Sequence, residues 1–221
     1  MSCYAVVDLE MCNVPSNVRK NKYHFAKETI QIGAVLLNES LEIVDQFATY
    51  VSPEFGFIDS FIKRLTGIGR HEVSNAPNME EALRRFANWL PEDVTVVSWS
   101  DNDKTQILHE IKGKDIHIEG IDRLFEGWID CQKIFSERLN SKKCYNLTEA
   151  LNIANINYQD GAHDGQVDAY NTALLFVKME NEEELQLNPY YSRMVCLEGD
   201  SSGFTIGSLF AGADLQRMIS A

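Results

Sequence analysis

The sequence lacks the cysteine patterns of a zinc site or a redox motif. No two cysteines stand in C-x-x-C spacing, and their number is odd. We therefore expect reduced thiols, no disulfide framework and no cysteine-based zinc site. The five residues are Cys3, Cys12, Cys131, Cys144 and Cys196.

Long apolar runs are also missing. No run approaches the roughly 20 residues that a membrane-spanning helix needs. The first residues show no basic segment followed by an apolar core, which is the pattern of a signal peptide. These absences predict a cytoplasmic protein without a membrane partner.

Positive charge is scarce. The chain has 20 Lys and Arg against 33 Asp and Glu, which gives a formal net charge of −13. A protein that coats long nucleic acid must neutralise many phosphates, so this charge argues against that class. The net charge is compatible with an enzyme that binds a few nucleotides at one end of a strand. Part of the negative charge would then serve to hold metal.

The first third of the chain has strand character. Residues 28–37 and 41–51 are rich in β-branched residues, and the short polar link 38–40 between them predicts a hairpin. Together with residues 3–10, these segments predict an antiparallel meander.

Helices and strands alternate in the rest of the chain. Residues 79–90 show helical periodicity with Asn78 as the expected N-cap, and the apolar segment 94–99 predicts a buried strand. Later elements are expected as a strand that runs into a helix at 128–135 and as helices over 102–113, 146–156 and 166–185.

This order of elements predicts an α/β fold. The expected architecture is a mixed five-stranded sheet, an antiparallel meander followed by parallel strands, with helices on both faces. The pattern breaks after about Asn188. We therefore divide the 221-residue chain into a domain of residues 1–188 and a C-terminal extension of residues 189–221 without an assigned role.

Two carboxylates stand one residue apart at the end of the first strand. By period-2 alternation Asp8 and Glu10 share one face, with Cβ atoms roughly 7 Å apart. Like charges this close raise each other's pKa, and a divalent cation removes the repulsion. Two acids on a solvated surface strand are the simpler alternative.

Other candidate groups follow later elements. Asp101 and Asp103 come after the apolar strand, at the sheet edge where α/β sites form, although helix capping would also explain them. His163 and Asp168 are five residues apart, which on one continuous helix is a rotation of about 140°. We therefore expect His163 on the loop that enters the helix and Asp168 on the helix itself.

The combined pattern is D-x-E on the first strand, an Asp after a buried strand, and H-x₄-D at a late helix. Over residues 4–180 it resembles the DEDDh group of 3′→5′ exonucleases, the superfamily of RNase T and polymerase proofreading domains, which has an RNase H-like fold. The stretch "FIKRLTGIGRHEVSNAP" is similar to the "LTGI…V…AP" segment of one branch. That branch includes histone-mRNA and small-RNA trimming exonucleases and sporulation-inhibitor-type relatives.

Two further stretches carry the resemblance. "WSDND" is similar to the branch's "W-G-x-x-D", which favours Asp103 over Asp101 as the fourth carboxylate, although both acids remain candidates. "AHDGQVDAYNTA" is similar to "H-S-G-x-D-D-x-x-N-x-A", with Val167 where a second acid is frequent, and it keeps the matched Asp168.

The resemblance implies a metal-dependent 3′→5′ exonuclease. Its substrate would be the 3′ end of single-stranded RNA or DNA, with RNA slightly favoured, and its product a nucleoside 5′-monophosphate. His163 would act as the general base, a role that suits a side chain that titrates near neutral pH. Two divalent ions, Mg²⁺ or Mn²⁺, would be held by Asp8, Glu10, Asp103 and Asp168.

The resemblance also implies a pocket for the terminal nucleotide. Its candidate residues flank the acids or lie in the matched loop, and they are Leu9, Met11, Thr66, Gly67 and Ile68. For Leu9 and Ile68, packing in the core is the alternative.

Three alternatives stand beside a general exonuclease. One is an oligoribonuclease-like enzyme that clears very short fragments, which the acidic charge fits. Another is a non-catalytic nucleic-acid or interaction module on the same fold, against which the complete set of acids argues. The third is a polymerase-bound proofreading subunit. The sequence leaves open RNA against DNA, the natural substrate and the oligomeric state.

Overall fold

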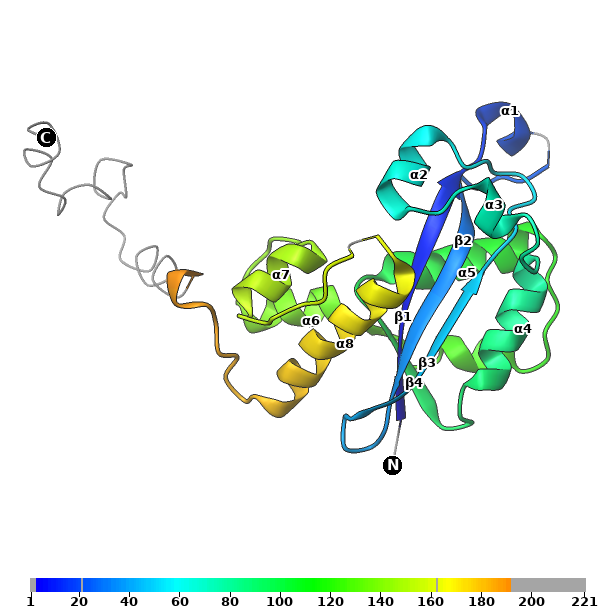
Figure 1. Ribbon diagram of the computed structural model, residues 1–221. Helices are drawn as coiled ribbons and strands as arrows, with labels where there is room; N and C mark the ends of the chain where they lie inside the picture. Colours follow the sequence, from blue (N-terminus) through cyan, green and yellow to red (C-terminus); the bar gives the residue numbers. More distant parts are fainter. Residues whose placement is uncertain (1–2, 21, 162, 192–221) are drawn as a thin grey trace, which may run out of the picture.

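The computed structural model describes residues 3–20, 22–161 and 163–191, and these form a twisted sheet with helices on both sides (Figure 1). The strand order is β3-β2-β1-β4-β5. Strand β1 pairs antiparallel with β2 and parallel with β4, so the predicted mixed five-stranded sheet is confirmed. The strands are β1 (Cys3–Asn13), β2 (Lys27–Leu37), β3 (Ile43–Tyr50), β4 (Val94–Ser98) and β5 (Ile129–Asp130).

The β2–β3 hairpin is formed by local side-chain capping. The carboxamide oxygen of Asn38 accepts hydrogen bonds from the amides of Ser40 and Glu42, both at 2.9 Å. Leu41 takes a left-handed conformation with φ of 60° to close the turn. The polar link predicted between the two strands is therefore a side-chain-stabilised turn.

The helices follow the predicted order, with short additions in the loops. The α-helices are α1 (Ser16–Arg19), α2 (Ser60–Thr66), α3 (Arg70–Val73), α4 (Met79–Trp89), α5 (Asp101–Gly113), α6 (Cys131–Arg138), α7 (Leu147–Ile153) and α8 (Gly165–Asn181). A 3₁₀ helix, η1 (Ile121–Phe125), precedes β5. The side chain of Asn78 accepts from the amide of Glu81 at 3.0 Å, so Asn78 is the N-cap of α4 as expected.

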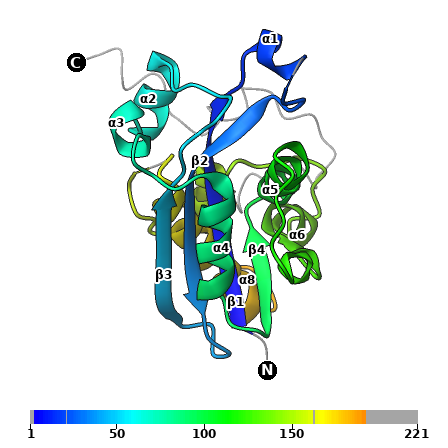
Figure 2. The ribbon, with the colours of Figure 1, turned by 90° about the vertical axis from the view of Figure 1, so that its right-hand side faces the viewer.

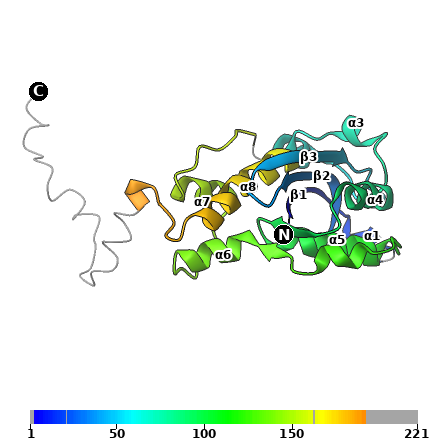
Figure 3. The same cartoon turned by 90° about the horizontal axis from the view of Figure 1, so that it is seen from below.

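Successive side chains of β1 point to opposite faces of the sheet and pack in two different cores. Val7 belongs to a cluster with Leu83 of α4, and Val6 belongs to a cluster with Ala169 of α8. Figure 2 shows α4 in front of the sheet and α8 behind it, and Figure 3 shows α6, α7 and α8 grouped on the side away from α4. Asp8 shares the parity of Val6, so its side chain projects on the α8 side.

A smaller core lies at the carboxyl end of β1. Cys12 of β1 packs there with Ile62 of α2, with Ile68 of the loop that follows α2, and with Val73 of α3. This cluster holds α2 and α3 beside the end of the strand, as Figure 1 also shows.

A buried ionic cluster joins the start of β2 to the end of α5. Lys114 Nζ lies 2.6 Å from Glu28 Oε1 and 2.7 Å from Glu110 Oε2, and the three side chains are at most 3% exposed. The Glu28 carboxylate also accepts from the amides of Glu54, Phe55 and Gly56 at 2.5–2.9 Å. Burial lowers the pKa of Lys114, but the charges of Glu110 and Glu28 outweigh it and raise that pKa above its ordinary value.

The described residues bear on two further sequence predictions, the C-terminal extension and the lack of a membrane-spanning helix. Residues 192–221 of the predicted extension lie outside them, so the division at residue 188 stays a prediction. Among the described residues, no helix combines the length and the apolar character that crossing a membrane requires.

Candidate active site

Asp8 and Glu10 lie on β1 just beyond the end of its parallel neighbour. The last pair between the two strands is Val7 with Ser98, so from Asp8 onward β1 has no strand on that side. The start of α5 occupies this position, and Asp103 Oδ1 accepts the amide hydrogen of Leu9 at 3.2 Å. The exposed edge of β1 is thus satisfied by a carboxylate that lies beside the two acids.

The two candidate acids of α5 occupy different environments. Asp103 is 6% exposed and faces β1, whereas Asp101 is exposed at the first residue of the helix. Ser100 is the N-cap, and its hydroxyl oxygen accepts from the amide of Asn102 at 3.4 Å. Of the two, the structure brings Asp103 to the cluster and leaves Asp101 outside it.

Helix α8 reaches the site because glycines allow backbone to contact backbone. A Cβ atom on Gly33 of β2 would lie 2.2 Å from the carbonyl carbon of Gly165, so any side chain there would displace the helix. The amide of Gly165 donates to Gln31 Oε1 at 3.0 Å. This close approach places Asp168, on the first turn of α8, next to β1 and β2.

His163 lies on the loop before α8, as the sequence predicts. Its backbone is left-handed, with φ of 67°, and its amide donates to Asp168 Oδ2 at 2.8 Å. One ligand atom from each of Glu10, His163 and Asp168 lies within 4.8 Å of the others. The imidazole therefore stands over the carboxylates while its ring stays exposed to solvent.

The acids form one electrostatic unit. Burial, then the charges of Asp103, Asp168 and Glu10, raise the pKa of Asp8 well above its ordinary value. Burial with the charges of Asp168 and Asp164 raises the pKa of Glu10 to about 8, against the opposing Lys27 ammonium. Burial and mutual repulsion thus outweigh the cation that acts on Glu10.

The two acids on helices show the same effect. Burial raises the pKa of Asp103 to about 7, although the hydrogen bond from the Leu9 amide lowers it. Burial also raises the pKa of Asp168, opposed by the hydrogen bond and the charge of His163.

This donor set fits divalent metal. Hard cations such as Mg²⁺ and Mn²⁺ prefer carboxylate oxygens, and their charge removes the repulsion that the buried acids otherwise keep. The geometry groups Glu10 and Asp168 with His163. Asp8 and Asp103 are the other candidate ligands, and their charges act on one another and on this group.

Sequence reasoning missed two residues at this site. Asp164 is the N-cap of α8, and its Oδ1 accepts from the Gln166 amide at 3.0 Å and from Gln31 Nε2 at 3.4 Å. Gln31 pairs with Glu10 across β1 and β2, so period-2 alternation places it on the same face. An Asp directly before a glycine and a helical pattern is a capping signal that could have identified Asp164.

The predicted nucleotide-pocket residues divide into two groups. Leu9 and Ile68 are 6% and 3% exposed and pack in the cores, so packing explains both side chains. Thr66 and Gly67 end α2: the Thr66 hydroxyl donates to the Ile62 carbonyl at 3.0 Å, and Gly67 is left-handed with φ of 73°. Contact of these residues and of half-buried Met11 with a nucleotide stays a prediction.

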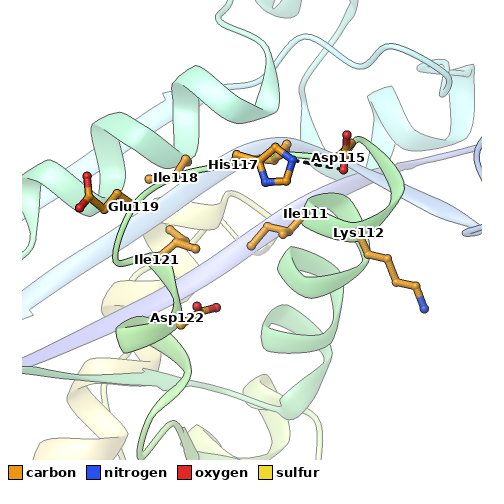
Figure 4. Close-up of a pocket in the computed structure, with 9 residues that line it drawn as sticks. Ile111, Lys112, Asp115, His117, Ile118, Glu119, Ile121 and Asp122 are labelled. Carbon is orange, nitrogen blue, oxygen red and sulfur yellow. Dashed lines mark ion pairs between the residues drawn. The ribbon is translucent and has the colours of Figure 1, made fainter.

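One hollow among the described residues lies away from the acids. It has a volume of about 580 Å³ between the end of α5 and η1, and Figure 4 shows Ile111 and Ile121 within it and His117 directed at Asp115. Asp115, Glu119 and Asp122 line its margin. An anionic substrate would meet repulsion there, so we do not place the active site in this hollow.

The raised pKa values predict an unusual pH dependence of stability in the absence of metal. A carboxyl with a raised folded-state pKa stabilises the fold when protonated, and that contribution is lost as pH rises through the folded pKa. In EDTA, the melting temperature should fall by several degrees between about pH 5 and about pH 8, the window set by Asp103 and Glu10. Mg²⁺ should restore more stability at the upper end of this window than at the lower end.

Thermal unfolding followed by circular dichroism checks this prediction. Asp103→Asn removes one of the titrating charges, so it should flatten the pH dependence, whereas Asp101→Asn should leave it unchanged. A melting temperature in EDTA that rises with pH over this window would contradict the electrostatic picture.

Carboxylates that converge at the carboxyl edge of a mixed, RNase H-like sheet are the site type of metal-dependent nucleases. The chain belongs to the exonuclease family: the family model described as Exonuclease, of the RNase T type, matches residues 5–176. Members of this family depend on divalent metal. The resemblance predicted from the sequence motifs is thereby confirmed.

Similar proteins agree with this family. ERI1 exoribonuclease 2 of Danio rerio is 29% identical over 198 residues, which cover 79% of this chain and 34% of that protein. A PolC-type DNA polymerase III of Caldanaerobacter subterraneus is 31% identical over 154 residues, 69% of this chain and 10% of that protein. The chain thus matches about a third or less of the length of these two relatives.

A solved structure confirms the fold. The nuclease domain of 3′hExo, a DEDDh family member bound to rAMP, superposes with a TM-score of 0.70 at 24% identity. The superposition covers 85% of this chain and 96% of that domain.

Proposed function

We propose that this protein is a metal-dependent 3′→5′ exonuclease that hydrolyses single-stranded nucleic acid from its 3′ end and releases nucleoside 5′-monophosphates. The observation that supports it best is the convergence of Glu10, His163 and Asp168, whose ligand atoms lie within 4.8 Å of one another. Asp8 and Asp103 extend this group, since the charges of Asp103, Asp168 and Glu10 all act on Asp8.

The residues of the site have separate roles in this reaction. His163 takes the proton from the attacking water, and its exposed position above the carboxylates leaves room for that water. The carboxylates that hold metal are Asp8, Glu10, Asp103 and Asp168. Two ions, Mg²⁺ or Mn²⁺, supply activation of the water and stabilisation of the leaving 3′ oxygen when bound.

RNA is the proposed substrate. Curated relatives include exoribonucleases. One structural neighbour is a 3′-exonuclease in a structure that describes its recognition of a histone mRNA stem-loop. Polymerase relatives make DNA the competing substrate. Very short fragments remain the alternative that the net charge of −13 favours. Cytoplasmic localisation stays a prediction.

A ladder assay tests the proposal. Matched 5′-labelled RNA and DNA strands of graded length, from dinucleotides upward, are incubated with Mg²⁺, Mn²⁺ or EDTA. We expect shortening by one nucleotide at a time from the 3′ end, with metal and not with EDTA, and faster on RNA. Rates that peak at the shortest lengths would favour the oligoribonuclease-like alternative.

A pair of variants on α5 makes the assay specific for the site. Asp103→Asn should remove most activity because it takes a negative ligand from the cluster, whereas Asp101→Asn should keep it. Absence of shortening on every substrate with either metal would refute the proposed function.

A further inference from the structure

A second hollow lies beside the acidic cluster, and we name it the α5 groove. It has a volume of about 560 Å³ between α5 on one side and Arg19 with residues 24–27 on the other. Met11, which follows Glu10, and Asn102, which precedes Asp103, both line it. The groove therefore borders the stretches of β1 and α5 that carry Glu10 and Asp103.

The charge of the α5 groove differs from that of the whole protein. The chain has 33 acidic residues against 20 basic ones, yet no carboxylate is among the described residues that line this groove. Its ionisable lining residues are Arg19, His24, Lys27 and His109. A phosphate would meet cations and no acid within it.

The Arg19 side chain has a hydrogen-bond donor without a partner among the described residues. Its Nε atom is buried and has no hydrogen-bond partner among the described residues. His24 Nδ1 donates to the carbonyl oxygen of Arg19 at 3.0 Å, which fixes the segment around it. A guanidinium with an unused donor is well suited to phosphate oxygens.

An aromatic pair forms part of the groove wall. The rings of Phe25 and His109 are stacked, with centroids 4.0 Å apart and an interplanar angle of 14°. Both residues are only partly buried. Aromatic surface next to cations is the combination that single-stranded nucleic acid uses, because bases stack while phosphates pair with charge.

Other hollows of the described residues fit a phosphate less well. One of about 460 Å³ beside α2 and α3 carries Lys63 and Arg70, but the carboxylate of Asp59 also lines it. The hollow at the end of α5 shown in Figure 4 carries three acids, Asp115, Glu119 and Asp122.

We propose that the α5 groove is a second substrate subsite, which binds a nucleotide of the single strand other than the one at the scissile bond. Arg19 and Lys27 hold its phosphate, and the Phe25–His109 pair stacks with its base. This inference rests on the proposed function, since it takes the strand that enters the acidic site as its occupant. It makes substrate affinity depend on a phosphate that takes no part in the chemistry.

Binding of labelled single-stranded RNA in EDTA, measured by fluorescence anisotropy over a salt series, tests the groove. Each lost phosphate contact should reduce the slope of log K against log salt by about 0.7. We expect that reduction for Lys27→Gln and for Arg19→Gln. Phe25→Ala should weaken binding about tenfold without changing the slope. Lys112→Gln, an exposed lysine at the other end of α5, is the matched control and should change neither quantity.

Turnover on two substrates gives an independent readout. An unphosphorylated dinucleotide has one phosphate, the scissile one, so Arg19→Gln should leave its hydrolysis unchanged. On longer strands the same variant should raise KM and keep kcat. The Arg19 Nε makes no hydrogen bond within the described residues, so little change in thermal unfolding should accompany these effects.

The outcomes separate the groove from the proposed function. Salt slopes equal to that of Lys112→Gln, or an equal loss on the dinucleotide and on longer strands, would overturn the subsite. If the wild-type protein bound RNA but shortened neither RNA nor DNA, the proposed function would fail, while the salt slopes would still decide the groove.

Discussion

Replacing His163 with alanine should lower kcat by roughly 10²–10⁴-fold while the protein stays folded and keeps its affinity for metal. The imidazole is the exposed member of the cluster, and its ring makes no contact that the core requires. Its backbone amide, which donates to Asp168 Oδ2 at 2.8 Å, is retained in the variant. The loss should therefore fall on proton transfer alone.

Single-turnover kinetics with saturating RNA and Mg²⁺, next to thermal unfolding, measure this effect. His117→Ala is the matched control, because His117 is exposed beyond the far end of α5, where it pairs with Asp115 at 3.3 Å. Full turnover by the His163 variant would remove the general base from the mechanism. The metal ligands would then still be tested by the Asp103 and Asp101 pair.

Replacing Lys114 with methionine should destabilise the fold by about 3–5 kcal/mol, the cost of removing one partner of a buried ion pair. Lys114 is the cation between Glu28 and Glu110, whose side chains are fully buried. Without it, both carboxylates remain in the interior with backbone amides and Gln106 as donors. Glu28 also fixes the segment 54–56, so the loss should extend toward α2.

Urea denaturation at several pH values measures this loss. The deficit should shrink at low pH, because protonated carboxyl groups leave no charge unpaired. Lys112→Met is the control two residues earlier, and an exposed substitution of this kind should stay within about 0.5 kcal/mol of wild type. A Lys114 variant as stable as that control would show that the cluster contributes little.

Local sequence signals predicted much of the fold. The 38–40 link, the Asn78 cap and the alternation along β1 each depend on neighbours within a few residues, so the pattern alone was enough. The boundaries of β4, observed at Val94–Ser98, differ by one residue from the expected strand.

Contacts between distant segments could not be predicted in the same way. Gln31 forms a hydrogen bond with Asp164, which is 133 positions away, and Lys114 forms an ion pair with Glu28. In the sequence alone, each of these four residues has the pattern of an ordinary surface residue. The choice between Asp101 and Asp103 depended on which side of α5 faces β1, which two neighbouring acids do not reveal. The α5 groove likewise depends on Arg19 and residues 24–27 lying against a helix about 80 positions later in the chain.

The glycine contact between β2 and α8 has a consequence for how this enzyme could diversify. Because Gly33 and Gly165 bring main chain against main chain, the spacing of the reactive groups is set by backbone and not by exchangeable side chains. Arg19 and residues 24–27 line the α5 groove instead, together with side chains of α5. Exchanging these residues between relatives should therefore change the preference for substrate length while the hydrolytic centre stays intact.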